Sequence, residues 1–315
     1  MSDSSNACVL GIDVGGTKTA AGIVLFPEGR VVSRRVMPTR PERAGDEVLR
    51  DVLGLARELL DEAESSGNAV AGIGVGIAEL VDPLGNVTSA HTIAWQGVPV
   101  RECFSRIAPA SVESDVRAAA LAEALFGAGR PFRLFIYITV GTGISHSLVM
   151  DGLPFAGARG NALIFASGRY TTICTECGAV LTPVLEAFAS GPALVERFNR
   201  HCPGRARTGA DVLVAAEVGE PEAVEVVQTA GEALGVSVGA LINELDPEAI
   251  VVGGGLGLAG GLYWDSFVAS TRGHIWAENS RDTPILPAAL GNDAGLIGAA
   301  AGLWRKLNLE RGTLR

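Results

Sequence analysis

The alternation of apolar and polar residues at the start of the chain predicts β-hairpins. Residues 8–14, 21–26 and 30–37 are short β-type runs. Gly15-Gly16 separates the first two runs, and Pro27-Glu28-Gly29 separates the next two. Turn residues between β-type runs are typical of antiparallel hairpins. We therefore expect the chain to open as an antiparallel sheet.

The apolar period then changes from that of a strand to that of a helix. Residues 43–65 carry Val and Leu at near-helical spacing with charges between them, which predicts an amphipathic helix packed on the sheet. Residues 69–80 predict a buried strand that runs into a Gly-rich turn. Residues 110–127 predict a strand end, the polar tip Glu113-Ser114-Asp115 and an Ala-rich helix.

The second half repeats the opening plan. Residues 134–150 predict a strand, a glycine turn and a second strand, with Asp151-Gly152 as a hairpin turn. Residues 230–257 predict a helix followed by a buried strand. Residues 289–307 predict a C-terminal helix, with candidate capping residues at 291–293. The repetition suggests a duplicated lobe, so the pattern predicts an α/β fold with mixed sheets and flanking helices.

Composition narrows the class of protein. A chain of 315 residues exceeds the size at which one core usually keeps growing, so we expect two lobes. The net charge of −10 argues against nucleic acid as a partner, because a phosphate backbone requires a basic surface. The sequence has neither a signal-peptide pattern nor an apolar stretch of membrane-spanning length, so we expect a cytoplasmic protein without membrane contact.

Three glycine clusters are the strongest chemical signal. They are Asp13-x-Gly15-Gly16-Thr17-Lys18, Gly141-Thr142-Gly143 and Gly253-Gly254-Gly255. Such turns expose consecutive backbone N–H groups, which can cradle phosphate oxygens. A single Gly-Gly between strands is more often only a hairpin. Three clusters that alternate with strands and helices favour a nucleotide cleft.

The sequences and the order of the motifs resemble those of the ROK family (repressors, open reading frames and kinases) of the actin-like ATPase superfamily. The similar stretches span essentially the whole chain and are "GIDVGGTKTAAGIV", "GIGVGIAELVD", "WQGVPV", "SDVRAAALAEALFGAG", "ITVGTGI", "LEAFASGPAL", "LINELDPEAIVVGGGLG" and "ALGNDAGLIGAAAGL". The resemblance implies a two-lobed actin-like ATPase (ribonuclease H-like) fold, with lobes of 1–116 plus 292–315 and of 117–291. It also implies a kinase with ATP in the cleft, a sugar-type acceptor between the lobes, and a homodimer.

The resemblance also implies roles for the glycine clusters. Asp13 would lie beside the Mg²⁺–phosphate group, and other residues of its turn would contact phosphate oxygens: Gly15, Gly16, Thr17 and, less specifically, Lys18. The second cluster, Gly141, Thr142 and Gly143, would clamp the phosphates from the other lobe, and Gly254 and Gly255 would form a wall against the adenosine.

Asp115 matches the catalytic aspartate of the family pattern. A carboxylate at a strand-to-helix tip can accept the proton of the acceptor hydroxyl as the P–O bond forms. The alternative is that Asp115 is an ordinary helix N-cap, a position that Asp favours.

The departures from the family pattern lie on the acceptor side. Ser114 replaces an Asn, Glu79 introduces a carboxylate near the pocket, and an expected Asn is absent close to Thr92. In the stretch "GARGNALIFAS", which contains Gly160 and Asn161, Ile164 and Ser167 replace a Glu and a His that hold sugar hydroxyls. His146 could contact phosphate or acceptor, or be structural. We therefore expect a hexose-like acceptor other than glucose, such as an aminosugar or a C7-cyclitol.

The family's zinc site is incomplete in this sequence. Only Cys174 and Cys177 remain where the family has three Cys and one His, and structural zinc requires four N or S ligands. Cys202 or His201 could complete a rearranged set, but we expect two buried, reduced thiols and no zinc.

Two other functions stay open. One is a catalytically weak sugar- or nucleotide-binding sensor on the same scaffold, and the other is an ordinary glucokinase. Repressor members carry a helix-turn-helix segment before the first glycine loop, and seven residues precede Cys8 here, so we do not expect DNA binding.

Overall fold

The computed structural model describes residues 7–162, 164–169, 171–173 and 177–310, and the chain forms two compact units. Unit 1 consists of Met1–Pro131, Ser147–Ala162 and Ala289–Arg315, and unit 2 of Phe132–His146 and Leu163–Ala288. The sequence predicted a lobe boundary after residue 116, whereas this division keeps helix α3 (Asp115–Phe126) in unit 1.

Unit 1 is built on a five-stranded mixed sheet in the order β3-β2-β1-β4-β5. Its strands are β1 (Ala7–Val14), β2 (Lys18–Phe26), β3 (Arg30–Pro38), β4 (Val70–Ile77) and β5 (Ala110–Ser114). β1, β2 and β3 pair as antiparallel hairpins, as predicted, whereas β1, β4 and β5 run parallel. The sheet therefore has one edge at which three strands end with their carboxyl termini side by side.

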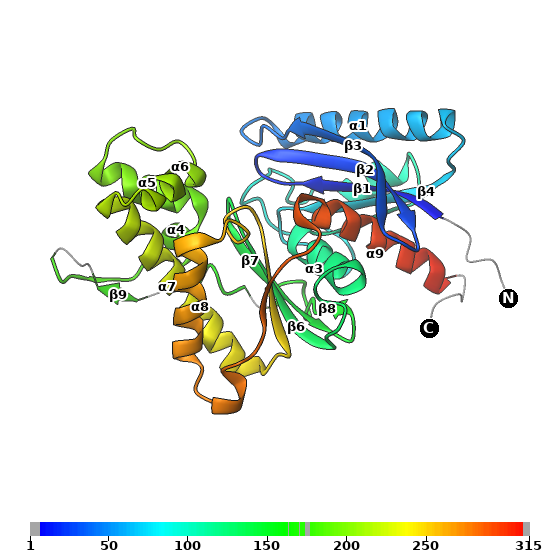
Figure 1. The fold of residues 1–315 in the computed structure, drawn as a ribbon. Coiled ribbons are helices and arrows are strands. Elements are labelled where there is room, and N and C mark those ends of the chain that lie inside the picture. Colours follow the sequence, from blue (N-terminus) through cyan, green and yellow to red (C-terminus); the bar gives the residue numbers. More distant parts are fainter. Residues whose placement is uncertain (1–6, 163, 170, 174–176, 311–315) are drawn as a thin grey trace. The chain divides into compact units, whose positions relative to one another are not determined.

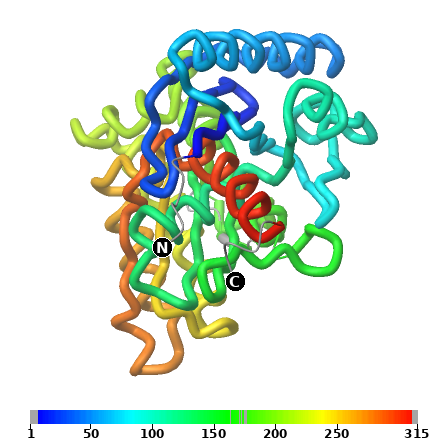
Figure 2. Tube along the Cα trace, turned by 90° about the vertical axis from the view of Figure 1, so that its right-hand side faces the viewer, coloured from blue at the N-terminus to red at the C-terminus, as the bar shows by residue number. Residues whose placement is uncertain are grey.

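Helices cover both faces of this sheet (Figures 1 and 2). Leu10 of β1 belongs to a core shared with α1 (Gly45–Ser65) and the short α2 (Val100–Ser105). The neighbouring Val9 belongs to a second core, shared with α3 and α9 (Ala294–Glu310). A strand buried on both faces reads as a continuous apolar run, which is the pattern of β1.

α9 packs directly on the backbone of unit 1. A side chain at Gly74 of β4 would overlap the carbonyl oxygen of Ala299, and one at Gly298 would overlap that of Ala118 in α3. Glycine at these positions lets strand, α3 and α9 approach without intervening side chains. The short 3₁₀ turn Gly291–Asp293 leads into α9, and the Asp293 carboxylate accepts a hydrogen bond from Arg34 at 2.7 Å.

Unit 2 contains most of a second five-stranded sheet, in the order β12-β11-β6-β7-β8. The strands are β6 (Leu134–Val140), β7 (Ile144–Met150), β8 (Leu153–Pro154), β11 (Ala249–Gly253) and β12 (Ile285–Pro287). β11 runs parallel to both β6 and β12. The segment Ser147–Ala162, which holds the end of β7 and all of β8, groups with unit 1. A two-stranded ribbon, β9 (Thr172–Ile173) with β10 (Val180–Leu181), stands apart from this sheet.

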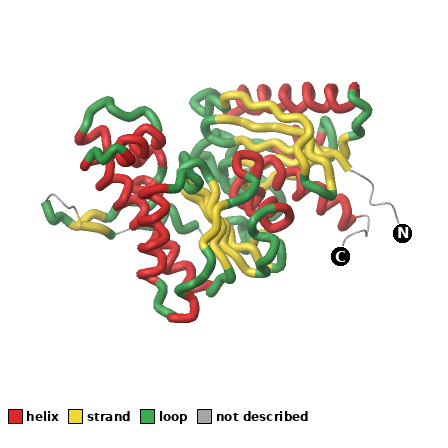
Figure 3. The backbone as a smooth tube through the Cα atoms, viewed as in Figure 1, coloured by secondary structure: helices red, strands yellow, loops and turns green. Residues whose placement is uncertain are grey.

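Unit 2 also contains several helices, joined by loops (Figure 3). They are α4 (Glu186–Ala189), α5 (Gly191–His201), α6 (Gly209–Glu217), α7 (Pro221–Leu245), α8 (Gly261–His274) and the 3₁₀ turn Glu278–Ser280. α7 begins at Pro221, before the helix predicted within 230–257, and ends at the expected turn, where Asp246 is left-handed. None of the described helices has the length and apolarity needed to cross a membrane.

Candidate functional site

Three carboxylates lie at the carboxyl edge of the parallel strands in unit 1. Asp13 is the penultimate residue of β1, Glu79 follows β4, and Asp115 follows β5 as the first residue of α3. The register pairs Asp13 with Gly76 of β4 and Gly76 with Glu113 of β5. The sheet thus gathers residues that are about a hundred positions apart in the sequence.

Asp115 has an unusual electrostatic setting. Desolvation by burial, with the charge of Asp13, raises its pKa to about 7. A hydrogen bond from the Val116 N–H to Asp115 Oδ1 (2.7 Å) opposes the shift. The N-cap position of α3 belongs to Ser114, whose buried hydroxyl has no partner among the described residues.

Asp13 shares this setting. Burial raises its pKa to about 6, and the charge of Lys18 opposes the shift. Its carboxylate faces the first turn of α9, where a side chain at Gly295 would overlap it. Glycine at position 295 therefore leaves room for the Asp13 carboxylate at the N-terminal end of α9.

The turn after Asp13 joins β1 to β2. The Gly15 N–H donates to the Lys18 carbonyl at 3.1 Å, and Thr17 and Lys18 are exposed. A side chain at Gly16 would lie 2.7 Å from Cγ2 of the exposed Thr92. The structure thus brings Thr92 next to the predicted phosphate loop.

Glu79 holds the segment that contains Thr92. It is buried, and its Oε1 accepts from the N–H groups of Thr92 (2.5 Å) and Ile93 (2.7 Å). Its Oε2 accepts from the His91 N–H at 3.0 Å and from the Ser89 hydroxyl. The carboxylate is therefore committed to four protein donors, a role that its position in the sequence did not indicate.

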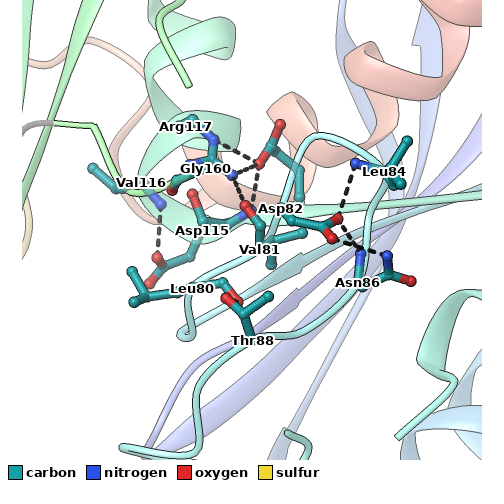
Figure 4. Close-up of polar contacts among 12 residues, drawn as sticks. Leu80, Val81, Asp82, Leu84, Asn86, Thr88, Asp115, Val116, Arg117 and Gly160 are labelled. Carbon is teal, nitrogen blue, oxygen red and sulfur yellow. Dashed lines mark hydrogen bonds and ion pairs between the residues drawn. The ribbon is translucent and has the colours of Figure 1, made fainter. Parts of the chain in front are cut away.

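Arg117 is a functional candidate that the sequence reasoning missed. Its side chain is buried and reaches Glu113 together with the carbonyls of Val81 and Gly160, all within unit 1 (Figure 4). The only local signal was an arginine in an otherwise Ala-rich helix. The predicted acceptor residues Gly160 and Asn161 lie in the segment that it holds, Gly160 buried and Asn161 exposed.

The turn Gly141–Thr142–Gly143 of unit 2 is anchored at both ends. The Gly141 carbonyl accepts from the N–H of Gly191 at the start of α5 (2.9 Å). The Ile144 N–H donates to Oε2 of Glu186 at 2.8 Å. Thr142 between them is exposed. Glu186 belongs to the "LEAFASGPAL" stretch, but nothing in the sequence indicated that it buttresses this turn.

The second glycine turn of unit 2 packs on the first. The Val140 carbonyl accepts from the N–H groups of both Leu256 and Gly257, at 3.0 Å each. Gly254 has φ +83°, and a side chain there would overlap the Val140 carbonyl. The structure therefore brings Gly254 and the exposed Gly255 beside the Gly141 turn, within one unit.

A cavity of about 140 Å³ adjoins the end of this second turn. Its lining comes from α6, α7 and the start of α8, and includes the apolar Leu213, Val227 and Leu262 together with Glu217 and Gly260. The cavity is small and mainly apolar, with one carboxylate in its lining.

His146 of β7 is buried, and neither ring nitrogen has a partner among the described residues. Burial lowers its pKa to about 4, so the ring is neutral at neutral pH. Phe165 meets it edge to face with 4.3 Å between ring centroids. Phe165 belongs to the altered stretch, in which Ile164 and Ser167 are exposed.

The cysteine pair is only partly described. Cys174 lies outside the described residues. Cys177 is exposed, so the expected burial is wrong for this thiol. Within the described ranges, no three His, Cys, Asp or Glu side chains form a metal-binding group.

Each unit has features that suit one part of group transfer from an anionic ligand. Unit 1 offers a carboxyl group that titrates near neutral pH and a second carboxylate beside a glycine turn. Unit 2 offers two packed glycine turns and an apolar cavity. A base poised near the working pH and backbone N–H groups for phosphates are what phosphoryl transfer needs.

Comparison with known proteins agrees with this chemistry. A family model described as "ROK family" matches residues 9–306. A glucokinase of Streptomyces coelicolor is 32% identical over 92% of this chain and 96% of its own length. The bifunctional enzyme NanE/NanK of Brucella melitensis is 31% identical over 93% of this chain, which spans 53% of that enzyme.

The fold is also similar to that of a solved structure. A ROK family glucokinase from Streptomyces griseus, in complex with glucose and AMPPNP, has a TM-score of 0.79 and 30% identity over 94% of this chain and 98% of its own. The predicted fold class, mixed sheets with flanking helices of the actin-like ATPase type, is confirmed.

Proposed function

The chain belongs to the ROK family, and on that premise we propose that it is an ATP-dependent kinase that phosphorylates a primary hydroxyl of a hexose-like acceptor. The main support for the proposal is the state of Asp115. Its carboxyl group lies at the carboxyl edge of three parallel strands, and its pKa is raised to about 7. General bases work best when their pKa is close to the operating pH.

The residues of unit 1 would do the following. Asp115 would accept the proton of the attacking hydroxyl. Gly16 and Thr17 would offer backbone N–H groups and a hydroxyl to phosphate oxygens, and Gly15, whose N–H donates to the Lys18 carbonyl, would shape the turn. Asp13 would hold Mg²⁺, since an ionised carboxylate beside a glycine turn fits a hard cation. The metal, when bound, neutralises phosphate charge.

The residues of unit 2 would bind the nucleotide. The packed turns at 141–143 and 253–257 would offer phosphate oxygens those backbone N–H groups that are not already bonded within the turns. Side chains at Gly254 and Gly257 would clash with the carbonyls of Val140 and Gly253. The cavity beside Gly260 is our candidate for the adenine base. The relative from Streptomyces griseus supports ATP use, because its structure is a complex with the ATP analogue AMPPNP.

The acceptor is proposed to differ from glucose at its C1–C2 edge. The altered stretch presents Ile164 and Ser167 where the family has Glu and His. A site that has lost polar partners no longer selects for the hydroxyls they bound. A carbocyclic C7-cyclitol lacks an anomeric hydroxyl, and an aminosugar differs at one ring position, so both fit the change.

The first experiment measures ATP consumption with Mg²⁺ against a panel of acceptors. The panel contains glucose, mannose, N-acetylmannosamine, glucosamine, 3-amino-3-deoxyglucose, valienol and a valiolone-type ketone. We expect turnover, with cyclitols or aminosugars preferred. Preference for glucose identifies an ordinary glucokinase. No turnover with any member favours the sensor and contradicts the proposal.

Asp115→Asn separates a kinase from a binding protein. The variant should lose about 10²–10⁴-fold in kcat, the usual contribution of a general base, while its Kd for ATP by calorimetry stays the same. Asp61→Asn, at an exposed aspartate of α1, is the matched control and should keep full activity. An Asp115→Asn variant with near-normal kcat would remove Asp115 from the mechanism.

A further inference from the structure

Arg117 joins three segments of unit 1 with one buried guanidinium. Nε donates to Glu113 at 2.7 Å, Nη1 to the Gly160 carbonyl at 2.7 Å, and Nη2 to the Val81 carbonyl at 2.6 Å, while Nη2 also forms an ion pair with Glu113. The three partners belong to the end of β5, to the chain after β4 and to the segment 157–162 (Figure 4).

Only an arginine can make this set of contacts. The guanidinium carries five N–H donors in a rigid plane, whereas lysine has one compact ammonium group. The side chain of Arg117 is 8% exposed, and a buried cation must be paired and hydrogen-bonded. The partners supply one carboxylate and two carbonyl oxygens, which fix the direction of each N–H group.

Gly160 packs against the backbone of residue 81, in addition to accepting a hydrogen bond from Arg117. Its φ is +78°, and a side chain there would overlap the Val81 carbonyl. Residue 160 therefore lies directly on residue 81, and the carbonyls of both residues accept from the same guanidinium. Arg117 is also two positions after Asp115 on α3, so the base and the tether share one helical turn.

We propose that Arg117 is a positioning residue that holds the acceptor segment 157–162 in register with Asp115. This inference rests on the proposed kinase function, because it assigns the segment to the acceptor. Loosening the tether should weaken acceptor binding and leave ATP binding intact, since the glycine turns that would hold ATP make no contact with Arg117 in the interactions described above.

The test compares Arg117→Lys and Gly160→Ala with the wild type. Arg117→Lys keeps the positive charge and loses the planar set of guanidinium donors. Gly160→Ala keeps Arg117 and disturbs the packing of residue 160 on the Val81 carbonyl. Each should raise the acceptor KM by about tenfold, with the ATP KM within about twofold of wild type. Arg34→Lys is the control, because Arg34 also pairs with a carboxylate of unit 1, at 2.7 Å from Asp293, but on the surface.

A double-mutant cycle then asks whether the two residues act together. Because both changes release the same segment, the double variant should raise the acceptor KM little more than either single change. A purely structural role would instead lower specific activity with both KM values unchanged. An acceptor KM within about twofold of wild type in folded Arg117→Lys overturns the proposal, and Gly160→Ala decides if Arg117→Lys does not fold.

Hydrogen exchange of the 157–162 backbone tests the tether without any assay of activity. Exchange at Ala162, whose N–H donates to the Ala156 carbonyl at 3.2 Å, should accelerate in Arg117→Lys and in Gly160→Ala, and not in Arg34→Lys. Unchanged exchange overturns the inference whatever the enzyme does. Accelerated exchange in a protein that phosphorylates no member of the panel would mean that the tether exists and the proposed function fails.

Discussion

At the scale of single residues, Asp115 owes its properties to competition between desolvation and neighbouring charges. Burial and the charges of Asp13 and Glu79 favour the neutral acid, whereas the Val116 N–H and Arg117 favour the carboxylate. The balance places its pKa near 7, far above that of an exposed aspartate. Asp13 follows the same rule, with Lys18 as the opposing charge.

This balance predicts the pH dependence of the enzyme. Asp115 must be ionised to accept a proton, so kcat/KM for the acceptor should fall about tenfold per pH unit below pH 7. Initial rates from pH 5 to 9 at saturating ATP and Mg²⁺ measure the profile. The exposed-site control Asp61→Asn should show the same acidic limb, and a rate that is flat from pH 5 to 7 would contradict the assignment of Asp115 as the base.

At the scale of elements, the position of α9 depends on glycines that face other backbones. The predicted strands and helices were confirmed where local periodicity is strong, as in β1, α1 and β11. The close packing of α9 on β4 and α3 could not be predicted, because it requires glycines from elements far apart in the sequence to meet.

Two Gly→Ala changes should therefore have opposite effects on the free energy of unfolding. Gly298→Ala should destabilise the protein by about 1–3 kcal/mol, because the added methyl group meets the Ala118 backbone. Gly54→Ala, inside α1 with no atom near the new methyl group, should stabilise it by about 0.5–1 kcal/mol. Urea denaturation measures both, and equal effects would contradict the packing argument.

At the scale of the whole molecule, unit 1 is assembled from three separate stretches of chain. Its C-terminal stretch is fastened by Glu123 of α3, whose buried carboxylate accepts from the N–H groups of Ala289 (3.1 Å) and Leu290 (2.8 Å). The homodimer and the cytoplasmic location stay predictions.

Removal of the last stretch should therefore unfold unit 1. A chain that ends at Ala288 loses α9, including Leu296, Ile297 and Leu303 of the second core, and burial of each such side chain contributes about 1.5–3 kcal/mol. We expect it to be insoluble or to lack a cooperative thermal transition. A chain that ends at Glu310 keeps α9 and should melt like the full protein, and a folded chain ending at Ala288 would contradict this account of the core.

Sequence reasoning alone was enough for the family, for the elements with strong local periodicity such as β1, α1 and β11, and for the three glycine turns. Those features depend on local periodicity and on backbone requirements that a short stretch of residues expresses. The hydrogen-bonding roles of Glu79, Arg117 and Glu186, and the pKa values of Asp13 and Asp115, became visible only in the folded protein. Each of these depends on burial and on hydrogen-bond partners from remote segments, which no local pattern records.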